Sequence, residues 1–148
     1  MIGFGNGITT NGESKLWAVD NQQRSVVEFD VDSVSGNLQY HSRIEMDSLI
    51  DNLHYEEETG NIMAAYIGRG IDFKNYISGV QKGQEVSPIH SGASYLMFKD
   101  GVFEQRKDLV LQDKISSASV AVAWGKGKNR KIFMGSWHDP KLGICEGL

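Results

Sequence analysis

The segment LIDNL, residues 49–53, places two polar side chains, Asp51 and Asn52, inside a run that otherwise has the composition of a buried β-strand. A buried carboxylate or amide costs free energy unless it finds a partner. Carboxylate and amide oxygens are also the ligands that calcium takes in proteins. The pair therefore leaves two alternatives open, a metal site or polar groups that cap the backbone of their own strand.

Asn6 occupies a similar position in an earlier part of the chain. It lies ten residues before the segment LWAVD, and Asn52 lies ten residues before the segment IMAAY, with the turns NGES and ETGN between. The two units are offset by 52 − 6 = 46 residues. A third unit begins at 116–124, SSASVAVAW, and resumes after a turn at 131–137, KIFMGSW. The sequence therefore predicts an internal repeat built from short strands.

The repeat predicts an all-β fold, because no window shows a sustained helical period. The units span about 4–46, 49–111 and 116–146, with four, four and three strand segments. A period of this length with four strands per unit is typical of a β-propeller. Because closed propellers need at least about four blades, we expect three blades of a larger, six-bladed ring. The last blade lacks its outer strand, so the chain is expected to be a fragment or to pair with another half.

Propeller geometry predicts that these polar side chains lie close together. The first strand of a blade is innermost, so the starts of successive inner strands face one mouth of the central channel. Asn6, Asp51 and Asn52 are therefore expected to converge there as a cluster of oxygen ligands suited to calcium. A long connection over residues 68–93 is expected to arch over the same mouth.

Composition narrows the range of partners and compartments. The chain has 148 residues with 40% hydrophobic content, which is enough for one core. Acidic residues outnumber basic ones by 19 to 15, so nucleic acid is not an expected partner. We find no apolar run long enough for a membrane span and no leader peptide. Cys145 is the single cysteine, which excludes a disulfide within the chain.

Four segments carry a family resemblance: FGNGI (4–8), LIDNLHYEEETGNI (49–62), SVAVA (119–123) and GICEGL (143–148). In order and spacing they resemble the C-terminal half of the paraoxonase/arylesterase family, six-bladed propellers that hydrolyse aryl esters and lactones with a channel calcium. The resemblance implies that Asn6, Asp51 and Asn52 match catalytic calcium ligands. It also implies a secretory compartment, and that Cys145 matches a cysteine bonded to a partner near the family's N-terminus. The family's general-base histidines belong to the half that this sequence lacks.

The sequence departs from that family at two positions. Arg24 and Ile67 stand where the family carries active-site histidines in the loops after the second strands. Sugar-lactonases and strictosidine-synthase-like propellers share the axial Asn and Asp arrangement, so these families are alternatives to the paraoxonase/arylesterase family. Two functions are therefore weighed. The chain is part of a calcium-dependent hydrolase of small esters or lactones, inactive alone, or a non-catalytic propeller segment that serves as a binding surface.

Further side chains are weaker candidates for the substrate pocket. Ser117 and Ser119 stand at the inner entrance of the third unit, and His54 lies two residues after Asn52, on the same face of the strand. A strand histidine is equally explained as a hydrogen-bonded neighbour. The expected partners are a small ester or lactone and either a missing half or a second copy of the chain.

Overall fold

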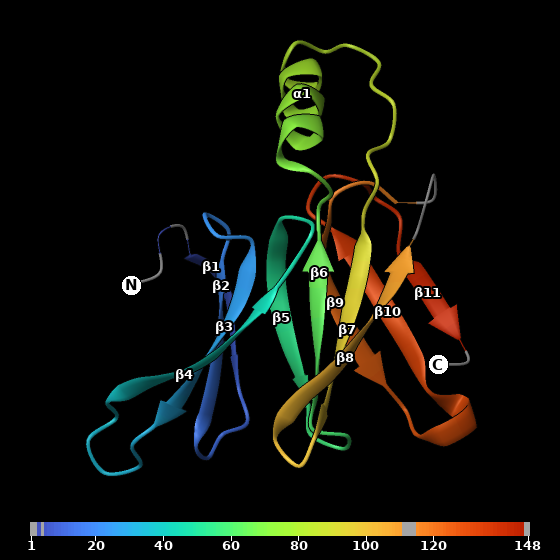
Figure 1. The fold of residues 1–148 in the computed structure, drawn as a ribbon. Coiled ribbons are helices and arrows are strands. Elements are labelled where there is room, and N and C mark those ends of the chain that lie inside the picture. The colour runs from blue at the N-terminus through green and yellow to red at the C-terminus, as the bar shows by residue number, and fades with distance from the viewer. Residues whose placement is uncertain (1–2, 4, 111–114, 147–148) are drawn as a thin grey trace.

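The computed structural model describes residues 3, 5–110 and 115–146 (Figure 1). Within these residues the fold is all-β apart from one α-helix and one short 3-10 helix. The strands of the described part form three antiparallel sheets of four, four and three strands, and none of them closes on itself. This confirms the all-β class and the arrangement of three successive sheets.

Each sheet is a meander whose strands follow chain order. The first sheet contains β1 (Gly5–Thr10), β2 (Lys15–Asp20), β3 (Ser25–Val31) and β4 (Leu38–Glu45). The second sheet contains β5 (Ile50–Glu56), β6 (Asn61–Tyr66), β7 (Gly92–Lys99) and β8 (Val102–Val110). The third sheet contains β9 (Ala118–Trp124), β10 (Lys131–Ser136) and β11 (Gly143–Glu146). The strands lie within the predicted units, whose limits at residues 4 and 111 fall outside the described residues.

The hairpin turns are closed by local side-chain bonds. The side-chain amide oxygen of Asn11 accepts hydrogen bonds from the backbone N–H groups of Glu13, Ser14 and Lys15, and these bonds build the turn between β1 and β2. Gly60 has φ +71° in the turn between β5 and β6, a conformation that glycine adopts without steric cost. These are the NGES and ETGN turns of the repeat.

Two apolar clusters fill the spaces between the sheets. Successive side chains of a strand point to opposite faces, so Ile62 and Ala64 of β6 join the cluster with the first sheet, whereas Met63 and Ala65 join the cluster with the third sheet. The middle sheet is therefore covered on both faces, which explains why β6 reads as a continuous apolar run. The first cluster also includes Trp17, Val19, Val26, Ile44 and Leu96, and the second also includes Tyr95, Ile132 and Met134.

The first strands of the three sheets, β1, β5 and β9, lie side by side, and we call them the inner strands. β5 contacts both β1 and β9 although these strands belong to different sheets. Across the first junction Gly7 lies against the backbone of residues 51–53, and Thr9 Oγ1 accepts a hydrogen bond of 3.1 Å from the Tyr55 N–H. The contacts advance in the same direction along both strands, so β1 and β5 run parallel and begin at the same end of the molecule.

A helix in the connection between β6 and β7 corrects the sequence prediction. The segment 68–93 was expected to be a connection without helical period, but it contains α1 (Gly70–Gln81). Its apolar residues Phe73, Tyr76, Ile77 and Val80 recur at the i, i+3, i+4, i+7 spacing of an amphipathic helix, and none of them is exposed. Arg69 precedes the helix without a side-chain cap, and the sequence lacks the usual start signal. α1 stands beyond the end of β6 and the start of β7 (Figure 1).

Candidate metal centre

The candidate residues lie where the inner strands begin, and each of these strands has an irregular register there. Ile50 pairs with Tyr66 and Leu53 with Ala64, so Asp51 and Asn52 stand against a single residue of β6. In β1 the same irregularity lies between Gly5 and Ile8 and contains Asn6. Bulges redirect side chains and are frequent beside functional sites.

The third inner strand carries a related irregularity. Ala118 pairs with Ser136 and Val120 with Gly135, so the bulge in β9 falls at Ser119. The bulges align Asn6 with Asp51 and Ser119, at an offset of 51 − 6 = 45 residues in the first two sheets. This corrects the sequence alignment, which matched Asn6 with Asn52 at an offset of 46.

The polar side chains of the bulges connect neighbouring inner strands. The Asn6 side chain, on β1, lies close enough to the Asp51 carboxylate, on β5, to lower its pKa as a hydrogen-bond donor. The Asn52 amide donates to the Ser119 carbonyl at 2.8 Å, from β5 to β9. Within the described residues neither Asp51 nor Asn52 bonds the backbone of its own strand. The strand-cap alternative therefore does not describe these side chains, which instead join sheets.

Asp51 is the charged member of this cluster. Burial raises the pKa of its carboxyl above the ordinary value, and the Asn6 hydrogen bond lowers it by less. No lysine, arginine or histidine pairs with it within the described residues. The site therefore holds a half-buried carboxylate whose ionised form is disfavoured until a cation approaches.

The two asparagines both use the NH2 groups of their amides on neighbouring polar groups. The Asn52 NH2 group is engaged by Ser119 and, more weakly, by Asp51 at 3.4 Å. The Asn6 NH2 group is engaged by the carboxylate. Each amide therefore uses its donor side on a neighbouring strand, and its carbonyl oxygen accepts no hydrogen bond within the described residues. Two amide oxygens and a carboxylate form the hard-oxygen ligand type that calcium prefers.

The ligand types distinguish calcium from the transition metals. Within the described residues no three or more histidine, cysteine, aspartate or glutamate side chains gather as a metal-binding group. Zinc sites use nitrogen and sulfur ligands, so this cluster does not fit zinc. Three side chains also fall short of the six to eight oxygens in a calcium shell, so a complete site needs ligands from outside the cluster.

Gly7 allows the first two inner strands to approach. A Cβ atom at this position would lie 2.4 Å from the Asp51 carbonyl oxygen and 2.6 Å from the Asn52 Cα. Both atoms belong to the backbone, so they cannot move aside as a flexible side chain would. Gly7 is a positioning residue that the sequence analysis named only within the segment FGNGI.

Asn21 is a second positioning residue that was missed from the sequence. Its side chain is buried in the turn after β2, donates to the Ile50 carbonyl at 2.7 Å and accepts from the Ile50 N–H at 2.9 Å. This pair of bonds fixes the first residue of β5, directly before Asp51. The only local sequence signal at Asn21 is the polar pair Asp20 and Asn21 after an apolar strand, and such a pair is typical of an ordinary turn.

The two serines expected to line the pocket differ in their surroundings. Ser119 contributes its backbone carbonyl to the Asn52 bond. Ser117 has φ +54°, is fully buried, and its hydroxyl meets no hydrogen-bond partner among the described residues. A non-glycine residue in this left-handed region is strained, and such strain often occurs at functional sites.

Other predicted residues lie away from the cluster. His54 is half-buried on the side of β5 that faces the third sheet, in a shallow depression with Ala123 and Trp124 of β9. Cys145 packs against the second apolar cluster as a free thiol, and its expected disulfide partner is not part of this sequence. Arg24 is exposed in the turn between β2 and β3, whereas Ile67 is buried after β6.

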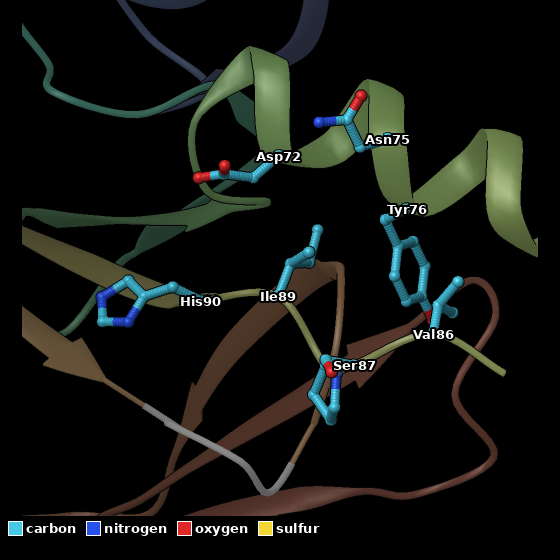
Figure 2. A pocket seen from close by; sticks show the side chains of 8 residues that line it. Asp72, Asn75, Tyr76, Val86, Ser87, Ile89 and His90 are labelled. Carbon is cyan, nitrogen blue, oxygen red and sulfur yellow. The ribbon is translucent and has the colours of Figure 1, made fainter.

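A cavity of about 410 Å³ lies between α1 and the segment that returns to β7 (Figure 2). Asp72, Asn75 and Tyr76 line it from the helix, and residues 86–90 line it from the other side. The Tyr76 ring also meets the His138 ring edge to face, with 5.9 Å between centroids, which ties the helix to the third sheet. α1 and the returning segment stand at the end of the second sheet where β5 begins (Figure 1).

Comparisons with known proteins supply no family for the chain. No protein-family model matches the sequence, and no curated protein is significantly similar to it. Among the described residues, no helix has the length and apolar character needed to cross a membrane.

Proposed function

We propose that the chain supplies the calcium-binding part of a hydrolase that acts on aryl esters or lactones and has the six-bladed propeller fold. The observation that carries the proposal is the convergence of Asn6, Asp51 and Asn52 from two neighbouring inner strands. The three side chains offer oxygens of the type calcium takes, and the half-buried Asp51 has no cationic partner within the described residues. The resemblance to the paraoxonase/arylesterase family supports the same assignment.

The chemistry follows from the roles of these side chains. Calcium, when bound, supplies a Lewis acid that polarises an ester carbonyl and stabilises the oxyanion formed on attack by water. Asp51 contributes the negative charge that holds the cation. Asn6 and Asn52 contribute neutral oxygens, so the charge of the cation is not cancelled. Their NH2 groups are held by neighbouring strands, and the amide oxygens therefore need little reorganisation.

The base that activates water lies outside this cluster. The four histidines have other surroundings: His41 pairs with Asp30, His54 faces β9, His90 lines the cavity beside α1, and His138 contacts aromatic rings. As a monomer the chain is therefore expected to show no calcium-dependent turnover of phenyl acetate or a simple lactone. Turnover that Asp51→Asn removes would place the base within one chain.

A non-catalytic binding module is the alternative function, and one observation favours it. The cavity beside α1 has the volume of a small-molecule site and combines Tyr76 and Ile89 with polar groups. This function requires binding without calcium. It predicts that a ligand of the cavity binds equally to the parent chain and to Asp51→Asn.

Calcium titration tests the proposed function directly. Added calcium is expected to raise the melting temperature of the parent chain, because a ligand that binds the folded state stabilises it. Asp51→Asn should respond little. Asp47→Asn is the matched control, since Asp47 is an exposed aspartate that pairs with Arg106 and lies outside the cluster. Equal responses of all three proteins would overturn the calcium assignment.

A further inference from the structure

The two end sheets of the chain each leave one face uncovered. We call the face of a sheet toward the next sheet in chain order its forward face, and the opposite face its backward face. In the described structure the forward faces of sheets one and two pack on the backward faces of sheets two and three. Among residues 3, 5–110 and 115–146, no sheet lies against the backward face of the first sheet or the forward face of the third sheet.

The backward face of the first sheet is largely apolar, with Arg43 on its outer strand opposite Val27. Trp17 and Val19 point forward into the first cluster, so the alternate residues Leu16 and Ala18 point backward. Residues directly opposite one another in neighbouring strands share a face. Ile8 is opposite Ala18, so it also points backward. Phe29 is opposite both Leu16 and Tyr40, so these three side chains form a row on the same face. Ile8 is 63% exposed and Tyr40 is 59% exposed.

The forward face of the third sheet is apolar over its middle, with the ion pair of Lys131 and Glu146 at one end. Ala121, Ile132 and Met134 point backward into the second cluster, so Val120, Val122 and Phe133 point forward. Val122 and Ile144 lie on either side of Phe133 in the ladder. Trp124 is 68% exposed and Ile144 is 52% exposed.

Equivalent positions show what the missing neighbour would cover. Ile8, Leu53 and Ala121 follow the bulges of the three inner strands at the same register. Leu53 is 9% exposed and Ala121 is 2% exposed, because each packs on the preceding sheet. Ile8 occupies the same position without a preceding sheet, and it is exposed. The chain thus carries both halves of one more junction of the kind it already contains twice.

From these faces we infer that a second copy of the chain completes the ring, with each third sheet packed on the first sheet of the other copy. The contact is head to tail, and such contacts form a closed ring when the rotation between units closes. Three sheets from each copy give six, which lies within the range of closed propellers. Each copy would bury both of its open faces.

The ligand shell supplies a second argument for a copy of the same chain. This step rests on the proposed calcium function. One chain offers three ligand side chains, which is half of the smallest calcium shell. A twofold ring places two sets of Asn6, Asp51 and Asn52 around one axis. The six side chains carry two negative charges, which matches the charge of the cation.

The experiment measures the mass of the full chain in solution with and without calcium. Sedimentation is expected to give twice the 16.4 kDa of one chain. Calcium should strengthen the dimer, and by linkage the dimer should bind calcium more tightly, by about 5- to 150-fold if the coupling is of ordinary size. A folded monomer at all concentrations, or open-ended polymers, would overturn the closed dimer.

Three matched substitutions locate the contact. Ile8→Asp places a charge on the backward face, Ile144→Asp places one on the forward face, and both should be monomeric. Ile71→Asp is the control, because Ile71 is 60% exposed on α1, away from both faces, and this variant should stay dimeric. Circular dichroism establishes whether each variant keeps its strands.

Mixing the two face variants gives a test that does not depend on either variant alone. In the mixture one junction joins two unaltered faces, so association should return in part. No association in the mixture, or dimers of both single variants as stable as the parent dimer, would overturn the pairing of these faces. A dimer whose stability does not change with calcium would refute the calcium function but not the dimer. A monomer that binds calcium tightly would refute the dimer but not the calcium function.

Discussion

The side-chain amide of Asn52 donates a hydrogen bond of 2.8 Å to the backbone carbonyl of Ser119, and this bond joins the inner strands of the second and third sheets. Asn52 is therefore both a structural link and a candidate calcium ligand. Its two functional atoms have separate tasks, since the amide nitrogen makes the link and the amide oxygen accepts no hydrogen bond among the described residues. Substitutions that remove one atom at a time can separate these tasks.

Asn52→Asp keeps a ligand oxygen and removes the donor. The new carboxylate would face the Ser119 carbonyl and lie beside Asp51, so we expect a loss of about 1–3 kcal/mol in the calcium-free protein. Added calcium should recover much of this loss, because the cation neutralises both carboxylates. Urea unfolding with and without calcium measures both effects. A loss that calcium does not reduce would separate Asn52 from the metal.

Gly7→Ala tests the close approach of β1 and β5. The added methyl group would meet backbone atoms at 2.4–2.8 Å, so the strands must move apart. We expect a destabilisation of about 1–3 kcal/mol, the usual cost of overpacking. Gly70→Ala is the control, because its Cβ would lie 3.5 Å from the Leu49 side chain, an ordinary contact. Thermal unfolding of the two variants compares them directly, and equal melting temperatures would contradict the close approach.

Glu56→Gln tests the junction at the other end of β5. The buried Glu56 carboxylate accepts hydrogen bonds from Arg130 at 2.7 and 2.8 Å and from Tyr95 at 2.7 Å. Leaving the Arg130 charge without its partner should cost about 3–5 kcal/mol. Glu58→Gln removes an exposed partner of Lys126 and should cost about 0–1 kcal/mol.

The Glu56 pair also predicts a dependence on acid. Burial raises the Glu56 pKa, but hydrogen bonds from Thr59, Tyr95 and Arg130 outweigh burial, and the net pKa lies below its usual 4.5. A carboxylate with a lowered folded-state pKa contributes stability that is present above the unfolded-state pKa and is lost as pH falls through the folded-state value. The stability difference between the parent and Glu56→Gln should therefore shrink below about pH 4.5. A difference that persists there would contradict the assignment.

The sequence predicted the strands and their order because the evidence for them is local. Alternating apolar residues, turns such as NGES and the repeat period depend on near neighbours, and the observed sheets follow them. The placement of Asn6 beside Asp51 came from the repeat together with propeller geometry. The offset was one residue wrong because the second sheet has the longer hairpin: residues 11–15 separate the paired Thr10 and Leu16, whereas residues 56–61 separate the equivalent pair Tyr55 and Ile62.

The remaining features depend on contacts between distant segments. α1 is the exception, because Phe73, Tyr76, Ile77 and Val80 carry a helical i, i+3, i+4, i+7 period that the sequence prediction overlooked. Asn21 was missed because its function comes from Ile50, which lies 29 residues away in the chain. The Ser117 backbone conformation is likewise set by its surroundings, since serine has no preference for positive φ.

The three candidate ligands should differ in their effect on calcium binding. Asp51→Ala removes a charge as well as an oxygen, so it should weaken calcium binding most. Asn6→Ala and Asn52→Ala each remove a neutral oxygen and should weaken binding less. Calorimetric titration of the three variants gives this order, with the monomer expected near the millimolar range of weak sites. If all three variants bind calcium as the parent does, the polar side chains of the bulges serve only to join the inner strands. The calcium site of the proposed hydrolase would then be refuted.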